Sequence, residues 1–269
     1  MAANAFRIQI AGLIVEVQPL YERVADYCRR YRVDWEMSDP EAYARASGPE
    51  SGDTEISCMA SHTDIRITMT EEDLELEQEI QYANSHRPGD KAELEILALY
   101  RKLTDVLSYH DTFLMHGSVI AVDGEAYMFT AKSGTGKSTH SALWRQYFGP
   151  RAVMVNDDKP LITIRGGQSY ACGTPWDGKH HLSNNLILPL KAICILERGR
   201  ENEIYEISYT EAFPMLLQQT HRSRNPVVLT HTLELLESLR QSTHFFRLHC
   251  NQNPEAARIS YEGMQGLRD

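Results

Sequence analysis

One short segment constrains the fold of this 269-residue chain more than any other: AKSGTGKST, at residues 131–139. It follows a run of β-forming residues and opens a stretch with helical spacing. The chain is therefore predicted to pass here from a strand through a tight loop into a helix. Its two glycines allow the backbone to approach a ligand closely. Successive backbone N–H groups and the helix N-terminus then form a concavity that favours an anion.

This loop has the residues that phosphate binding requires. Lys137 is placed to reach the terminal phosphates of a nucleotide, and the Ser138 hydroxyl to ligate Mg²⁺. The strict motif begins with glycine, whereas this chain has Ala131. The alternative is a glycine-rich turn with an incidental lysine. We predict nucleotide binding, and the residues assigned to it are Ser133, Gly134, Thr135, Gly136, Lys137, Ser138 and Thr139.

Strands and helices alternate after residue 108, which predicts an α/β fold for this part of the chain. Two β-rich runs, at 117–122 and 125–131, are joined by Asp123-Gly124, a dipeptide typical of tight hairpins. Further strands are expected at 152–155, 161–164, 191–196 and 244–249, and helices at 137–148, 210–220, 227–241 and 254–266.

The earlier part has a different texture. We expect a strand or hairpin at 6–17, a helix at 20–31, a loop at Ser47–Asp53 and a strand at 64–70. The segment Asn84–Asp90 has the composition of a linker, and a helix is expected from 91 to 109. These features predict a smaller N-terminal α+β domain at 1–90, followed by the α/β domain at 91–269.

Negative charge is concentrated in the first part. Residues 1–108 hold 21 acidic and 11 basic side chains and the remainder hold 16 of each, which gives a formal net charge of −10. An acidic surface repels a phosphate backbone, so no nucleic-acid partner is expected. The acidic run at 71–79 is interpreted as a solvated helix face, and a docking face for a basic partner is the alternative.

Composition excludes several other classes of protein. The chain is 42% hydrophobic, enough for a core, yet it has no run of about 20 apolar residues that could span a bilayer. The N-terminus lacks the pattern of a secretion signal. Five scattered cysteines without CxxC spacing favour free thiols in a reducing compartment. We therefore expect a cytoplasmic protein without a membrane partner.

A pair of carboxylates follows the phosphate loop by about 20 residues. Asp157 and Asp158 end a short apolar run, VMVN at 153–156. Ligands bind at the carboxyl ends of parallel strands, where one carboxylate can hold Mg²⁺ and the other can accept a proton. Adjacent residues of a strand point to opposite sides, so both reach one site only if the strand end kinks. The alternative is a pair of turn aspartates.

Residues 116–162 together resemble the catalytic domain of the HPr kinase/phosphorylase family. The likeness rests on His116-Gly117, the hairpin at Asp123-Gly124, the loop Ser133–Ser138 and the pair Asp157-Asp158. ATP-dependent phosphoenolpyruvate carboxykinases are similar around their own phosphate loop. The resemblance implies a P-loop kinase domain of this superfamily that uses ATP and Mg²⁺. It also implies that His116 lies at the active site. Asp157 and Asp158 would share metal binding and general-base work, with Asp158 favoured as the base and Asp157 as the metal ligand beside Ser138.

The chain departs from that family elsewhere. Residues 1–108 do not resemble the N-terminal domain of the HPr enzymes, and the glycine-rich signature tied to phosphorylase activity was not found. In its place stands GTPWDGKHH, at 173–181, which resembles segments of HPr-kinase-like proteins whose acceptor is unknown. HPr itself is therefore not expected as the acceptor.

This second polar cluster is a loop, and loops on a rigid scaffold commonly carry substrate contacts. Lys179 is expected to neutralise charge on the transferring phosphoryl group. His180 and His181 are expected to bind an anionic acceptor. The alternative is an ordinary loop in which Trp176 is a packed anchor. Neighbouring Cys172 is expected to pack, and Arg222 and Arg224 form either an anion-binding patch or a solvated loop.

The sequence therefore predicts a Mg²⁺-dependent ATP phosphotransferase that moves the γ-phosphate to a hydroxyl group. The acceptor is a serine of a peptide or protein, or a small metabolite. Two alternatives stay open: a nucleotide-sensing regulatory protein that transfers nothing, and a phosphoenolpyruvate carboxykinase-like enzyme. A homo-oligomer is expected by analogy with the HPr enzymes.

Overall fold

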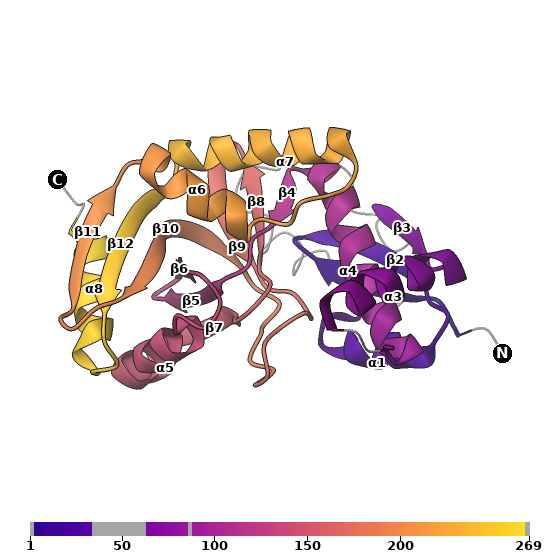
Figure 1. The fold of residues 1–269 in the computed structure, drawn as a ribbon, viewed down its shortest axis with the longest axis horizontal. Coiled ribbons are helices and arrows are strands. Elements are labelled where there is room, and N and C mark those ends of the chain that lie inside the picture. The colour runs from indigo at the N-terminus through magenta and orange to yellow at the C-terminus, as the bar shows by residue number, and fades with distance from the viewer. Residues whose placement is uncertain (1–2, 34–62, 86–87, 267–269) are drawn as a thin grey trace, which may run out of the picture. The chain divides into compact units, whose positions relative to one another are not determined.

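The computed structural model describes residues 3–33, 63–85 and 88–266. The loop predicted at Ser47–Asp53 lies outside the described residues. The chain divides into two compact units, Met1–Val106 and Leu107–Asp269. Figure 1 shows the elements of both units in chain order. Within the described part of the chain, no helix is both long enough and apolar enough to cross a membrane.

The first unit contains a three-stranded sheet and helices. The predicted hairpin is confirmed: β1 and β2 pair antiparallel around Ala11-Gly12, both of which have positive φ. β3 adds to β2 in parallel, which gives the order β1-β2-β3. The elements described in this unit are β1 (Phe6–Ile10), β2 (Leu13–Gln18), α1 (Glu22–Tyr27), β3 (Ile65–Thr68), α3 (Glu71–Ser85) and α4 (Lys91–Leu107).

The two compact units meet at 106/107, whereas the predicted division lies at 90/91. All but the last residue of α4 belongs to the first unit. The reason is a buried carboxylate: Glu95 is 0% exposed and accepts the backbone N–H groups of Leu20 and Tyr21 at 2.6 and 2.9 Å. The predicted linker at Asn84–Asp90 overlaps α3 by two residues, since α3 continues to Ser85, and residues 88–90 have no regular structure.

The second unit is mixed α/β, as the alternation of strands and helices predicts. Its nine-stranded sheet has the order β4-β8-β9-β10-β6-β5-β7, and β12 joins β10 to β11. Three of these strands, β4, β9 and β11, are not apparent in the sequence. The strands are β4 (Thr112–Leu114), β5 (Ser118–Val122), β6 (Glu125–Thr130), β7 (Ala152–Asn156), β8 (Leu161–Arg165), β9 (Gln168–Cys172), β10 (Ile187–Arg198), β11 (Glu203–Ile207) and β12 (His244–Cys250).

The sheet curls at β10. Residues 187–189 of this strand pair antiparallel with β9, and the later residues pair in parallel with β6 and β12. β10 therefore belongs to both halves of the sheet and joins them. The helices of this unit are α5 (Lys137–Phe148), α6 (Tyr209–Gln219), α7 (Pro226–Ser238) and α8 (Glu255–Gln265), each within a few residues of a predicted helix.

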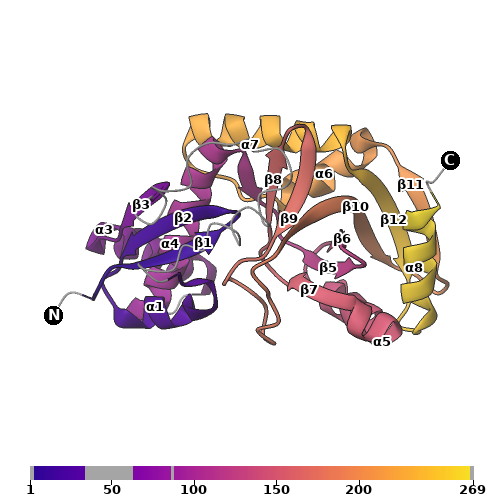
Figure 2. The same ribbon diagram turned by 180° about the vertical axis from the view of Figure 1, so that it is seen from behind.

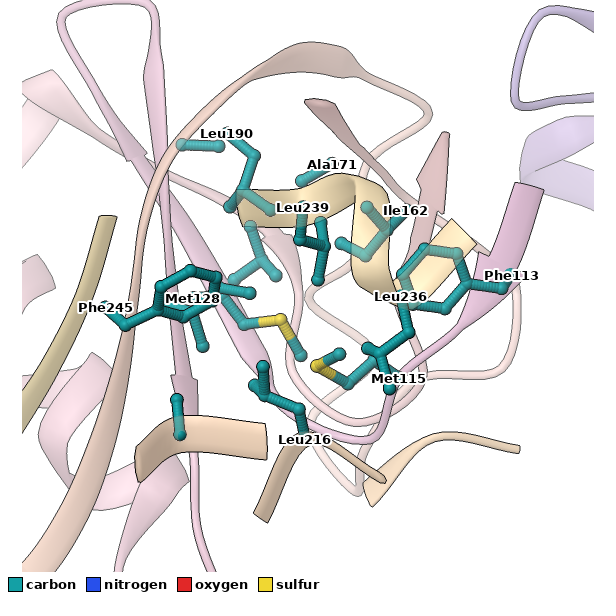
Figure 3. Close-up of a cluster of buried hydrophobic side chains, with 14 of the residues drawn as sticks. Phe113, Met115, Met128, Ile162, Ala171, Leu190, Leu216, Leu236, Leu239 and Phe245 are labelled. Carbon is teal, nitrogen blue, oxygen red and sulfur yellow. The ribbon is translucent and has the colours of Figure 1, made fainter. Parts of the chain in front are cut away.

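Two apolar layers cover the two faces of the sheet, because alternate residues of each strand point to opposite sides. On β6, Met128 faces one layer, while Tyr127 and Phe129 face the other. The first layer includes side chains from α6 and α7 (Figure 3). The second layer is closed by Trp144 of α5 and Met264 of α8. The strand before the phosphate loop is therefore held rigidly from both sides.

Candidate functional site

The hairpin that leads into the phosphate loop forms as predicted. β5 and β6 pair antiparallel, and the turn residues Asp123 and Gly124 have φ values of 53° and 87°. Two successive positive φ values are those of a type I′ turn, which matches the twist of the paired strands. β6 then ends at Thr130, and α5 begins at Lys137. The predicted passage from strand through loop to helix is confirmed.

The loop backbone depends on its two glycines. Gly134 and Gly136 have φ values of 76° and 124°, which side-chain-bearing residues adopt only with strain. Gly136 caps α5, and no side chain caps the helix N-terminus. The first N–H groups of the helix are thus left for an anionic ligand. Ala131 is fully buried and lies outside the positive-φ region, so glycine is not required there.

Lys137 lies along the loop. Its ammonium donates to the carbonyl of Ala131 at 3.3 Å. Burial lowers the pKa of this amine, and the charge of Asp158 partly opposes that effect. The ammonium and the carboxylate therefore attract each other across the site, although Asp158 belongs to a different strand end.

Topology explains why these groups meet. β5 pairs antiparallel with both β6 and β7, so the carboxyl ends of β6 and β7 lie at the same edge as the start of β5. Hydrogen bonds secure this edge: Gly117 N–H donates to the Asp158 carbonyl at 3.0 Å, and the Thr130 hydroxyl to the His116 carbonyl at 3.0 Å. The same backbone region binds α6, through His116 N–H and the Gln219 carbonyl at 2.7 Å.

His116 and Asp158 form a pair. His116 Nδ1 lies 3.0 Å from Asp158 Oδ1, and Lys159 Nζ lies 3.0 Å from Oδ2. Burial alone would raise the pKa of Asp158, but the hydrogen bond from His116 and the charge of Lys159 outweigh it and hold the pKa at about 2. The ionised carboxylate can only accept, so Nδ1 carries the proton, and in the neutral imidazole Nε2 is then the acceptor.

Asp157 faces a different neighbour. Its side chain is buried, and Oδ1 accepts the N–H of Gly178 at 2.5 Å. The turn that separates the two carboxylates is set by Asn156, whose Oδ1 accepts the N–H groups of Asp158 and Lys159. No motif in the sequence indicated this role of Asn156.

The cluster at 173–181 is both an anchored and an exposed loop. Trp176 is 4% exposed, as expected for a packed anchor, while Lys179 and His180 are exposed. Asp177, which sequence reasoning passed over, is buried and accepts from His181 Nδ1 and the Ser183 hydroxyl, both at 2.8 Å. Figure 2 shows this segment between β9 and β10, passing the end of β7.

A cavity of about 420 Å³ lies on the other side of the phosphate loop. Its walls include Thr139 and Leu143 of α5, and Asn251 and Gln252 beyond β12. Arg198, at the end of β10, also lines it and donates to the Gly134 carbonyl at 2.7 Å. Because the cavity joins segments more than 100 residues apart, no short motif could have indicated it.

The structure also shows where Cys172 and the arginines at 222 and 224 lie. Cys172 is fully buried, and burial raises the pKa of its thiol to about 12, in agreement with a packing role. Arg222 and Arg224 are exposed. The chain before them runs antiparallel to residues 114–116, with His221 N–H on the Leu114 carbonyl. It therefore leads away from His116.

No family model and no curated protein matches this chain. Among solved structures it is similar to one described as the Hpr(Ser) kinase/phosphatase from Coxiella burnetii. That match has 9% sequence identity and a TM-score of 0.34, and it covers 58% of this chain and 99% of the other. Similarity at this level does not specify chemistry, so the function is inferred from the site itself.

Proposed function

We propose that the second unit is an ATP-dependent phosphotransferase of the P-loop type that transfers the γ-phosphoryl group to a hydroxyl acceptor. The observation that carries this proposal is the meeting, at one sheet edge, of an uncapped glycine-lysine loop with the His116–Asp158 pair. The first binds phosphate, and the second accepts a proton. A site that only bound nucleotide would need the glycine-lysine loop and not the His116–Asp158 pair.

Phosphate binding is assigned to the loop at 131–139. Its exposed N–H groups and the ammonium of Lys137 supply positive potential without moving, which suits a transition state with charge spread over the phosphoryl oxygens. The cavity beside Arg198 is large enough for a nucleoside and opens directly from Gly134 and Thr135. We assign the base and ribose of the nucleotide to it.

Proton transfer is assigned to His116 Nε2, with Asp158 holding the ring. A carboxylate with a pKa of about 2 is a weak base near neutral pH, whereas a general base works best when its pKa lies near the working pH. This refines the sequence-based assignment of Asp158 as the base itself. The hydroxyl proton passes to Nε2 while the acceptor oxygen forms a bond to the γ-phosphorus. The bond between the γ-phosphorus and the bridging oxygen breaks, and the nucleoside diphosphate leaves.

The residues present fit a magnesium–nucleotide complex. Ser138 is exposed in the first turn of α5, and Asp157 and Asp158 follow the last residue of β7. Within the described residues, no three His, Cys, Asp or Glu side chains gather to hold a metal by themselves. Mg²⁺ commonly takes one or two protein ligands and completes its shell with phosphate and water. When bound, it would neutralise phosphate charge.

The test uses γ-labelled ATP, Mg²⁺ and a host-cell lysate. The wild type is compared with Lys137→Ala and with Lys91→Ala, a control that removes an exposed lysine of α4. We expect label transfer, to precipitable or soluble material, that needs Lys137 and not Lys91. Nucleotide binding that needs Lys137, without any transfer to lysate or water, would replace the proposal with a regulatory nucleotide-binding protein.

A further inference from the structure

We propose that residues 173–186, which join β9 to β10, are the acceptor-binding loop. We further propose that this loop selects an acceptor with a carboxylate or phosphate group beside its hydroxyl. This inference rests on the proposed phosphotransfer and names the substrate class for that site. Three features carry it: the loop is tied to the strand that bears the carboxylates, its glycine lies against Asp157, and its exposed tip is cationic.

Both ends of the loop are fixed to β7. At the first end, Asn156 Nδ2 donates to the carbonyl and the hydroxyl of Thr174 at 3.1 and 3.0 Å. At the second end, Asn184 donates its N–H to the Val155 carbonyl at 3.1 Å and its amide to the Met154 carbonyl at 2.8 Å. The loop is therefore positioned by the same strand that positions Asp157 and Asp158.

Gly178 joins the middle of the loop to the site. Its N–H bonds to Asp157, and a Cβ built on it would lie 2.6 Å from Asp157 Oδ2 and 2.9 Å from Cγ. Real Cβ atoms do not approach so closely, so only glycine allows the loop to rest on this carboxylate. The requirement is one of space, since the φ of Gly178 is not positive.

The tip beyond Gly178 has a fixed shape. Asp177 accepts from His181 and Ser183, and His181 N–H donates to the Gly178 carbonyl at 3.1 Å. His181 adopts a φ of 49° to close this turn. Residues 179 and 180 are thereby presented at the surface, one and two positions from the glycine that touches Asp157.

The exposed tip of the loop carries the cation Lys179 and the hydrogen-bonding imidazole of His180. Asp157 and the Asp177 side chain are almost fully buried and already accept hydrogen bonds. Lys179 and His180 are exposed, and neither has a partner within the described residues. Such a tip, fixed beside the transfer site, suits an anionic group on the incoming acceptor.

The test uses the full chain, Mg²⁺ and γ-labelled ATP with defined probes. These are three serine peptides that differ only in flanking aspartate, alanine or lysine residues, and glycerate as a small hydroxycarboxylate. Wild type is compared with the Lys179→Gln/His180→Gln double variant and with Lys91→Gln, which removes an exposed cation of α4. A preference for the aspartate peptide identifies a peptide source, and one for glycerate a metabolite source.

We expect an anionic probe to exceed the lysine-flanked peptide at least about tenfold in kcat/KM, and the double variant to lose at least about fivefold of that preference, with a higher KM for the anionic probe. Nucleotide affinity should stay unchanged. Anionic probes should also slow tryptic cleavage after Lys179. Gly178→Ala, checked for cooperative melting, should speed that cleavage and raise the KM for the acceptor without changing nucleotide affinity.

Several results would overturn this inference. One is preference for the neutral or basic peptide, and another is a preference that survives in the double variant. A third is the absence of both transfer to and protection by every anionic probe while Lys137-dependent ATP turnover persists. Absence of Lys137-dependent nucleotide binding would instead refute the proposed function.

Discussion

His140 gives a quantitative prediction about the helix that follows the phosphate loop. Its side chain is 2% exposed and packs edge-on against Phe129, with ring centroids 4.5 Å apart. Nε2 lies 3.1 Å from the Ser260 hydroxyl, whose oxygen also accepts from Trp144 and whose proton lies toward the Ala257 carbonyl. Nε2 therefore donates, and Nδ1 has no partner among the described residues. Protonating His140 would bury a charge with nothing to accept its hydrogen.

The magnitude follows from the pKa. Burial lowers the pKa of His140 from its ordinary 6.5 to about 4. Between these values the unfolded chain binds a proton that the folded chain does not, so the stabilisation is fully present above pH 6.5. It is lost progressively as the pH falls toward 4. At about 1.4 kcal/mol for each tenfold change in proton affinity, the free energy of unfolding should fall by about 2 kcal/mol between pH 7 and pH 5.

The assay is urea unfolding followed by tryptophan fluorescence. Two of the three tryptophans, Trp144 and Trp176, belong to the second unit, and replacing Trp35 by Phe in every protein compared makes the signal report on the core of that unit. The wild type is compared at pH 7 and pH 5 with His140→Phe, or with His140→Gln if the first variant folds poorly. His110→Gln, at an exposed position, is the control.

We expect the His140 variants to lose about 2 kcal/mol less than wild type and the control to behave like wild type. Equal losses in wild type and in the His140 variants would refute this account of the buried imidazole.

Three further predictions concern single positions. Asp158→Asn should retain nucleotide binding and lose most single-turnover transfer, because the amide lacks the negative charge that stabilises the proton-bearing Nδ1 of His116; a variant that kept most of the rate would contradict this role. Ala131→Gly should lower the free energy of unfolding by about 1 kcal/mol in urea titrations and leave nucleotide affinity within about twofold; a gain in affinity would show that alanine limits the loop. Glu95→Gln should speed amide hydrogen exchange at Leu20 and Tyr21 and destabilise the first unit by about 1–3 kcal/mol, because one donor loses its charged acceptor; unchanged exchange would argue against this buried carboxylate.

Prediction from sequence succeeded where the signal was local. The Asp123-Gly124 hairpin and the start of α5 after Gly136 depend on backbone preferences of a few adjacent residues. The strands β4, β9 and β11 were not apparent, because their pairing with β8, β10 and β12 is decided by tertiary contacts rather than by local composition. The sequence predicted α4 as a helix but assigned it to the second domain. Its place in the first compact unit depends on Glu95, which binds the backbone of Leu20, 75 residues earlier in the chain.

The sequence alone therefore determined the mixed α/β class of the second unit and the glycine-lysine loop between a strand and a helix. Hydrophobic periodicity and the need for positive φ are written in consecutive residues. Only the tertiary structure decided that Asp158 meets His116 and that Asp157 instead meets Gly178, 21 residues later in the chain. Those contacts exist because β5 lies between β6 and β7 and brings three strand ends to one edge. Strand order depends on packing between distant segments, which no short stretch of sequence specifies.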